Sequence, residues 1–554
     1  MCARCEGDKS IYNTNYLPHV SYWTAIGSVE QFGAPPLHIM EPTSSITSEM
    51  IHEHSHTIVP MSAGSIPTPL NTNDMADSSM HINPDADIDV YEEDDMDEEY
   101  QDIEADGTDS SGDEDVDSDE DNTDDGYDEI VPIHRIYDGV RQQTESFTVD
   151  HVTPEMIASG AMDMQGISWH LTFHTRQEVR QERLQQYIRY ANLGVDRSKL
   201  IQEFHPKRNE KNIFKFRYTK RECHCSIVHF QLRHLLAATS KNDIYYSNSQ
   251  NIMHWCPTSR LSSEVISLSG SFSHVSVTTM AAKSDMLIVG GFMGEYIFKC
   301  VDGKQGGVHT GLITTNPNGI TNHMHIQQSR SGMHQCVISS NDQHVRTLDL
   351  SRLEIQSVFD FPWAANCSST SPDKRLLCIV GDDPKGVIIS ADSGEELCKL
   401  SGHLDYSFSC AWSPCGLYIA TGNQDCTTRI YDVRRSDKTL AVLDTELSAV
   451  RSLQFSNDGK CLVIAESADF VHIVDMTTLG RSEKLGDGSR TRAASVQTIE
   501  FFGEIAGVAL AGHHSDRLFI GNEDPRIGGI MEYERYSPHF RPDTHWNDVA
   551  ATVL

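Results

Sequence analysis

Short apolar runs alternate with turn-forming residues between residues 402 and 443. The apolar runs are 409–412, 417–422, 428–431 and 440–443, and Gly, Pro, Asn, Asp and Ser are concentrated in the segments between them. Short apolar runs bounded by such residues predict strands joined by tight turns. This stretch is therefore expected to form a four-stranded antiparallel meander.

Comparable runs recur from residue 226 to residue 535, close to the spacing of about 40 residues that is typical of propeller repeats. Runs such as 286–291 and 375–381 are expected to be inner strands of their repeats. The repeats are placed at 226–256, 273–300, 308–360, 361–400, 402–443, 445–482 and 497–535. The predicted fold class is all-β, a seven-bladed propeller over residues 223–540, in which ring closure removes free sheet edges.

The repeat at 402–443 also carries polar residues with the types and spacing of a hydrogen-bonded chain. His403, Ser409, Asp425 and Tyr431 are predicted to form this chain as a structural tetrad, in which the carboxylate orients the imidazole and hydroxyls close the ends. A catalytic interpretation would require an exposed nucleophile and an oxyanion hole. We therefore expect no enzyme activity and no cofactor.

Several segments of the chain resemble a family of WD-repeat (WD40) proteins shared by fungi and plants. The resemblance runs in patches from about residue 164 to 535 and rests on Gln165–Trp169, Ser226–Arg233, Gly402–Ser407, Gly422–Asp425, Ala468–His472 and Phe502–Gly507. It implies a WD40 propeller with a preceding segment. That family is largely without an assigned biochemical activity, so the resemblance implies no chemistry.

The charge of the chain is concentrated before the propeller. The formal net charge is −36, and residues 81–130 contain 25 Asp and Glu and no Lys or Arg. Such composition cannot offset the entropy of ordering, so residues 1–163 are expected to be disordered, with an acidic tract at 85–129. The tract is interpreted as a solvating tail or as a docking segment for basic partners. Ser110, Ser111 and Ser118 are candidate phosphorylation sites, because each has an acidic residue three positions later.

Three short motifs could suggest a metal. His52-Glu53-His54-Ser55-His56 matches the pattern of a zinc peptidase helix, but Pro60 would end that helix one turn later, and the peptidase remains only a remote alternative. Cys2 and Cys5, and Cys223 with Cys225, lack a second ligand pair at zinc-site spacing. No metal site is predicted.

Residues 164–222 are expected to form a helix and a basic strand that lead into the propeller. Thr175 and Glu178 form a capping-box pattern, and an apolar stripe follows before Gly194, namely Val179, Leu184, Tyr187, Ile188 and Ala191. We expect this helix to pack on the propeller rim, with a partner helix as the alternative. The segment 207–221 alternates basic residues with Phe214, Phe216 and Tyr218. A strand that closes the ring is favoured over nucleic-acid contact or a nuclear import signal.

The favoured function is a non-enzymatic scaffold that binds protein partners. Tyr431-Asp432-Val433-Arg434 is similar to the W-D-x-R box by which some propellers dock on a cullin-RING ubiquitin ligase adaptor. Asp432 and Arg434 are therefore candidate partner-binding residues, and the alternative function is a substrate receptor of such a ligase.

The chain has no apolar run of about twenty residues and no signal-peptide core. Single cysteines fall inside predicted strands, at Cys300, Cys336, Cys378, Cys410 and Cys461. We expect a monomeric protein of the cytoplasm or nucleus with a C-terminal tail at 541–554, without a membrane or nucleic-acid partner.

Overall fold

The computed structural model describes residues 149–210, 213–301, 307–436, 438–479, 483–484, 490–491 and 493–536. The acidic tract, Ser110, Ser111, Ser118, the motif at 52–56, the Cys2 and Cys5 pair and the C-terminal tail lie outside these residues, so the predictions made for them stay predictions.

Five separate four-stranded antiparallel sheets follow one another along the chain, each with its strands in sequence order. The first blade consists of β4 to β7 (Leu236–Ala238, Ile244–Asn248, Asn251–Cys256 and Leu261–Ser267), and the second of β8 to β11 (Val277–Lys283, Met286–Gly291, Glu295–Cys300 and Val308–Leu312). The third blade contains β12 to β15 (Thr321–Gln328, His334–Ser340, His344–Asp349 and Glu354–Asp360). The fourth contains β16 to β19 (Ala365–Thr370, Leu376–Gly381, Asp383–Ser390 and Glu396–Leu400). The fifth contains β20 to β23 (Ser407–Trp412, Tyr418–Asn423, Thr427–Asp432 and Thr439–Asp444).

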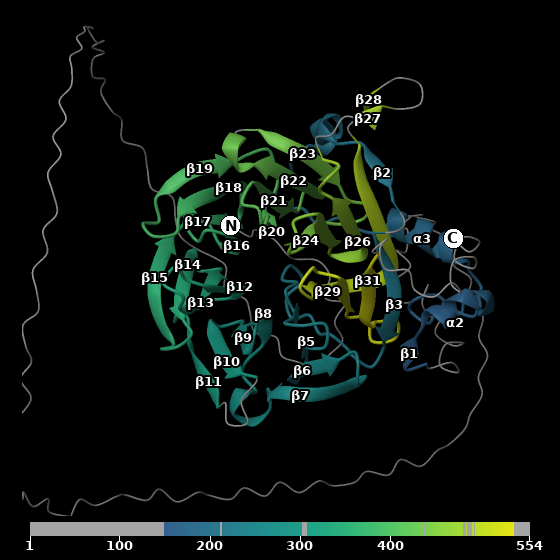
Figure 1. Ribbon diagram of the computed structural model, residues 1–554, viewed down its shortest axis with the longest axis horizontal. Coiled ribbons are helices and arrows are strands. Elements are labelled where there is room, and N and C mark those ends of the chain that lie inside the picture. Colours follow the sequence, from purple (N-terminus) through teal and green to yellow (C-terminus); the bar gives the residue numbers. More distant parts are fainter. Residues whose placement is uncertain are drawn as a thin grey trace, which may run out of the picture. The chain divides into compact units, whose positions relative to one another are not determined.

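The remaining blades share one long strand. The strand β29 (Ala494–Ala511) pairs through its first part with β26 and through its second part with β30. It is therefore the outer strand of a sixth blade, after β24, β25 and β26 (Val450–Phe455, Cys461–Glu466 and Ala468–Asp475), and the innermost strand of a seventh, before β30 and β31 (Arg517–Asn522 and Gly529–Arg535). The described residues thus form the predicted seven-bladed propeller, arranged as a ring (Figure 1).

The seventh blade is completed from the other end of the chain. Its fourth strand is β3 (Phe214–Lys220), which pairs antiparallel with β31. Phe214 and Tyr218 are buried, whereas Lys215 and Arg217 on the opposite side are exposed. The interpretation of the basic segment as a closing strand is confirmed for residues 214–220, whereas Lys207–Asn209 forms the separate strand β2, which pairs with β29.

The expected strand order within the blades needs two corrections. The innermost strands are the first of each blade, such as β8, β12 and β16, and they contact one another from blade to blade around the centre of the ring (Figure 1). The runs 286–291 and 375–381, expected as inner strands, correspond to β9 and β17, the second strands. Neighbouring blades bury both faces of these strands, so they are continuously apolar without being innermost. The exposed strand β11 belongs to the second blade by its pairing with β10, although it was assigned to the third.

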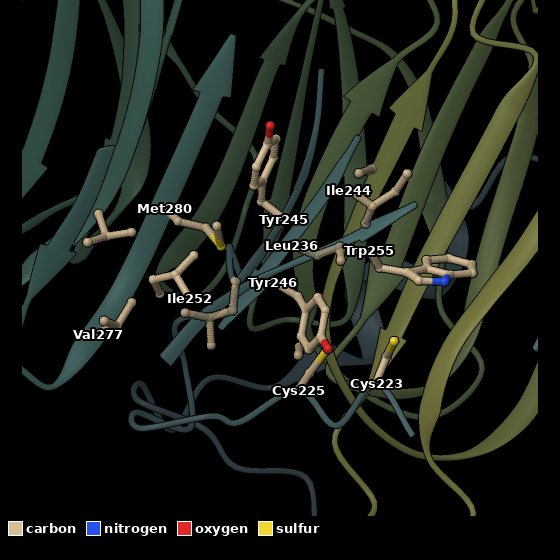
Figure 2. Packing of buried hydrophobic residues seen from close by; sticks show 14 of the residues in the cluster. Cys223, Cys225, Leu236, Ile244, Tyr245, Tyr246, Ile252, Trp255, Val277 and Met280 are labelled. Carbon is tan, nitrogen blue, oxygen red and sulfur yellow. The ribbon is translucent and has the colours of Figure 1, made fainter. Parts of the chain in front are cut away.

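The core consists of apolar clusters between neighbouring blades. In one of them, Tyr246 and Trp255 of the first blade pack with Val277 and Met280 of the second (Figure 2). Cys223 and Cys225 belong to the same cluster, and burial raises the pKa of both thiols. All described cysteines are free thiols.

An N-terminal arm, residues 149–210, precedes the closing strand. It contains β1 (His151–Val152), α2 (Pro154–Ala158), α3 (Arg176–Gln186), β2 (Lys207–Asn209) and two 3₁₀ helices, η1 (Trp169–Leu171) and η2 (Arg197–Glu203). The short elements η3 (Gly270–Phe272), η4 (Val433–Arg435), β27 (Glu483–Lys484) and β28 (Arg490–Thr491) lie within the propeller region.

The prediction that residues 1–163 are disordered was wrong for residues 149–163. They fold because β1 adds to the edge of β3 and buries Val152 completely. The helix α2 contacts the same strand, and local composition does not report contacts of this kind.

Candidate protein-binding surface

The propeller has two faces that differ in which loops they carry. Because successive strands of a blade run antiparallel, the turn between its second and third strands and the connection to the next blade lie on the same face. We call this the upper face. The turns between first and second strands and between third and fourth strands lie on the lower face.

The predicted tetrad lies at the upper edge of the fifth blade, but only two of its members meet. The Nδ1 of His403 lies 3.0 Å from Oδ2 of Asp425, and both side chains are buried. Burial opposes ionisation of Asp425, but His403 and the hydroxyl of Thr427 outweigh it and hold the pKa of this carboxyl below its usual value. The pair joins the connection before the blade to a turn within it.

Ser409 takes no part in this hydrogen-bonded chain, which corrects the predicted tetrad, whereas Tyr431 reaches the chain through the hydroxyl of Thr421. The Nε2 of His403 lies 2.8 Å from the hydroxyl of Thr421, while the hydroxyl of Ser409 is buried without a hydrogen-bond partner among the described residues. The hydroxyl of Tyr431 donates to the carbonyl of Ser401 at 3.0 Å. The second strand of the blade, which carries Thr421, faces the imidazole, whereas Ser409 stands on the first strand.

The helix α3 lies on the sixth and seventh blades through charged residues. The carboxylate of Asp469 is completely buried and accepts hydrogen bonds from Arg180 Nη1 at 2.6 Å and Arg183 Nε at 2.5 Å. The guanidinium of Arg180 also lies over the ring of Phe502, 4.2 Å from its centroid, and pairs with Glu500 at 2.9 Å. Arg180 and Arg183, paired with the carboxylates of Asp469 and Glu500, thus fasten α3 to the propeller.

This docking confirms that the helix packs on the propeller but corrects the face that it uses. The capping box of Thr175 and Glu178 is present, yet the buried residues of α3 are Val179, Arg180 and Arg183. Leu184 and Ile188 of the expected stripe are 43% and 77% exposed. The helix ends at Gln186 because Tyr187 is extended, and its ring packs against an apolar cluster of the sixth blade.

Beyond α3 the arm crosses the upper edges of the sixth and fifth blades. Arg189 Nε donates to the carbonyl of Leu447 at 3.0 Å, and the amide of Asn192 donates to Asp405 at 3.0 Å. Gln424 Nε2 donates to the carbonyl of Tyr190 at 2.7 Å. These bonds hold Tyr190 on the upper face of the ring.

Tyr190 belongs to an aromatic patch built from three segments. Its ring meets Phe230 edge to face at a centroid distance of 5.4 Å, Phe230 stacks on His229 at 5.2 Å, and His229 lies 6.3 Å from Phe292. Met293 follows Phe292 in an upper turn of the second blade. We refer to Tyr190, His229, Phe230, Phe292 and Met293 as the aromatic patch.

The patch is apolar and accessible. Tyr190, Phe230 and Met293 are 38%, 46% and 52% exposed. Burial and the nearby charges of Arg451 and Arg233 lower the pKa of His229 to about 4, so its imidazole is neutral at physiological pH. A contiguous exposed group of large apolar side chains is a feature of protein-binding surfaces.

Asp432 and Arg434 lie on the lower face, in the turn between the third and fourth strands of the fifth blade. Asp432 accepts hydrogen bonds from the backbone amide of Arg434 at 3.0 Å and from its guanidinium at 2.6 Å. The hydrogen bonds and charge of Arg434 lower the pKa of the Asp432 carboxyl. The side chain of Arg434 is 66% exposed, so it is accessible but already paired.

Comparison with protein families identifies the blade that carries His403 and Asp425. Residues 394–432 match the family described as WD domain, G-beta repeat. The chain therefore contains a WD repeat in its fifth blade.

Relatives of this protein include one from fission yeast. An uncharacterised protein of Schizosaccharomyces pombe is 27% identical over 292 residues, which is 50% of this chain and 81% of that protein. Coronin-7 of Mus musculus is 29% identical over 160 residues, 28% of this chain and 17% of Coronin-7.

Among solved structures, a chain from the crystal structure of a mitotic checkpoint complex is similar at 16% identity with a TM-score of 0.46. The match covers 63% of this chain and 99% of that chain. None of the helices in the described ranges has the length and hydropathy of a membrane span.

The sequence reasoning about this protein missed the aromatic patch. Ser226–Arg233 had drawn attention only as a segment that resembles the family, and Tyr190 and Met293 were not singled out. The feature that identifies these residues is their exposure next to other apolar side chains. Exposure depends on the folded ring, so the sequence does not show it. The segments meet because the arm crosses the upper edges of the sixth and fifth blades and the ring of Tyr190 reaches Phe230.

Proposed function

We propose that this protein is a scaffold of the cytoplasm or nucleus that binds a protein partner on its upper face through the aromatic patch. The observation that carries the proposal is the continuity of the patch across three segments, with Tyr190, Phe230 and Met293 all partly exposed. The partner would present an apolar anchor side chain to this surface.

The size of the patch suits a binding hot spot. Complete burial of a large apolar side chain contributes about 1.5–3 kcal/mol, so covering the exposed halves of Phe230 and Met293 would contribute roughly 1 kcal/mol each. The backbone of Tyr190 is held by Gln424, which limits the entropy lost when the ring is covered. The acidic tract at 85–129 would tune association with basic partners through its charge.

Proximity labelling in cells, followed by co-purification with the full-length chain, tests this function. The double variant Phe230→Ser with Met293→Ser is expected to lose at least about tenfold in recovery of the partners that the wild type captures, because its apolar anchors are gone. Leu312→Ser is the matched control, since Leu312 is 58% exposed on the outer strand of the same blade as Met293. Equal recovery by the double variant and the wild type would reject the patch as the binding surface.

The second candidate function is a substrate receptor of a cullin-RING ubiquitin ligase. Its support is the exposure of Arg434 on the lower face, where a guanidinium can donate to an adaptor. Asp432 would have to release or share this guanidinium on binding.

Recovery of a ligase adaptor by wild type but not by Arg434→Ala is the expected result for this second function. Arg330→Ala is the control, because Arg330 is a half-exposed arginine in another lower turn and is also paired with an aspartate. Recovery of no adaptor by the wild type would exclude the ligase role while leaving the upper-face scaffold intact.

A further inference from the structure

Two imidazoles and a thiol meet at the innermost layer of the propeller. His323 belongs to β12 and Cys367 to β16, the first strands of the third and fourth blades. His234 precedes β4, and its backbone bridges to Thr279 of β8. Figure 1 shows β8, β12 and β16 side by side at the inner edge of the ring. Neither the predicted tetrad nor the aromatic patch includes these three residues.

The three side chains have the proximity of a ligand set. Their donor atoms, one from each residue, lie within 4.8 Å of one another, and the rings of His234 and His323 have centroids 4.6 Å apart. With bonds of about 2.0–2.1 Å to nitrogen and 2.3 Å to sulfur, tetrahedral zinc places its ligand atoms about 3.3–3.6 Å apart. A contraction of roughly 1 Å, within reach of side-chain rotation, would complete that geometry.

Two further features favour a ligand. The side chain of Cys367 is a hydrogen-bond partner of both imidazoles, and the buried Nε2 of His234 and Nδ1 of His323 have no other partner among the described residues. The sulfur of Cys367 accepts the backbone amide of Cys410 at 3.4 Å. Such a bond stabilises a thiolate and is typical of the surroundings of metal-bound sulfur.

We propose that His234, His323 and Cys367 bind one Zn²⁺ at the centre of the ring. The donor set of two nitrogens and one sulfur suits Zn²⁺, whereas Mg²⁺ and Ca²⁺ require oxygen ligands. Binding releases the thiol proton of Cys367 to solvent, because the thiolate is the ligand. Three protein ligands leave one tetrahedral position for water or another donor.

The ion would connect three blades of the ring. His323 and Cys367 lie on the innermost strands of the third and fourth blades, and His234 lies just before the innermost strand of the first blade, so one ion would join all three. The expected consequence is a stabilised ring, because the ion binds the folded state and the three ligands come together only on folding.

Metal content and binding of the purified full-length protein test the site. The wild type is expected to retain about one Zn²⁺ per chain after dialysis, and a titration with Zn²⁺ alone should raise its melting temperature. Co²⁺ should give the charge-transfer absorption of a cobalt–thiolate bond. Cys367→Ser and His323→Ala are expected to weaken binding at least about 100-fold, since each removes a ligand.

Two controls separate this site from others on the chain. Cys398→Ser removes a half-buried thiol on the outer strand of the fourth blade and should leave zinc content unchanged. A variant with His52→Ala and His56→Ala should also keep its zinc, because the peptidase-like motif is not part of the site.

The proposal is overturned by either of two results. One is a wild type that binds no Zn²⁺ and gives no cobalt–thiolate absorption, which requires no variant to fold. The other is undiminished zinc in the triple variant with His234→Ala, His323→Ala and Cys367→Ser.

Discussion

Replacement of Asp469 by asparagine is expected to release helix α3 from the propeller without unfolding the ring. The side chain changes from a carboxylate to an amide of nearly the same shape, so the substitution removes a charge and leaves the volume intact. The backbone of Asp469 has a φ of 69°. Asparagine tolerates this left-handed region as aspartate does, so backbone strain is unchanged.

The cost follows from burial. Asp469 is completely buried and neutralises Arg180 and Arg183, whose side chains are each only 9% exposed. Removing one partner of a buried ion pair costs about 3–5 kcal/mol. The lower end applies because Arg180 keeps its pair with Glu500, so we expect about 3 kcal/mol in the free energy of releasing the arm.

This magnitude determines the assay. A loss of 3 kcal/mol raises the population of the released arm by roughly 150-fold, at 1.4 kcal/mol for each factor of ten. If the same loss were spread over cooperative unfolding of roughly 390 residues, the melting temperature would fall by only about 4 °C. Amide hydrogen exchange of residues 180–186 is therefore the sensitive measurement, since it reports local opening.

The matched control is Asp392→Asn. Asp392 pairs with Arg330 at 2.5 Å, but both side chains are at least half exposed, so its loss should cost less than about 0.5 kcal/mol. Exchange in α3 that accelerates less than about fivefold in Asp469→Asn, equivalent to about 1 kcal/mol, would refute the assignment of this ion pair as the fastening of the arm.

Three further variants test other parts of the structure by denaturant unfolding. His229 has a pKa of about 4 in the folded protein and about 6.5 in the unfolded chain, so its contribution to stability is complete above pH 6.5 and is lost as the pH falls toward 4. The variant His229→Phe should therefore show a weaker dependence of the unfolding free energy on pH, and an unchanged dependence would contradict this assignment. In Gly422→Ala the new Cβ would lie 2.4 Å from Cγ1 of Val450, which should lower the free energy of unfolding by about 1–3 kcal/mol. The control Gly194→Ala meets open space and should change that free energy by under about 0.5 kcal/mol. Equal effects of the two variants would argue against tight packing between these blades. Phe214→Ala should cost about 3–5 kcal/mol because the ring is buried in the closing strand, and a loss below 1 kcal/mol would show that closure does not depend on it.

The blades could be predicted because their contacts are local. The first five blades each pair strands that follow one another in the sequence, so the apolar runs and turns of 402–443 carry the information for the whole fifth sheet. The pairing of His403 with Asp425 spans only 22 residues of the same blade. Ser409 was predicted where the structure has Thr421, because the types and spacing of hydroxyl residues do not show which strand faces the imidazole.

The contacts of the N-terminal arm were harder to predict from the sequence than the blades. Within the apolar stripe of the sequence, Val179 and Tyr187 pack on the propeller, but Leu184 and Ile188 are exposed. The charged contacts of the helix come from Arg180 and Arg183 instead. Arginines can be buried only where a carboxylate neutralises them, and Asp469 lies 289 residues away from Arg180 along the chain.

The sequence by itself therefore indicated the number of repeats, the four strands of the fifth blade and a strand at 214–220, because periodic apolar runs and turn residues act over a few neighbouring positions. Only the tertiary structure decided where the ends of those strands meet. The aromatic patch, the buried ion pairs of α3 and the group of His234, His323 and Cys367 each combine residues from separate segments. These residues are close only because the ring is closed. The geometry of the ring depends on the twist of every blade, so it cannot be predicted from any one segment.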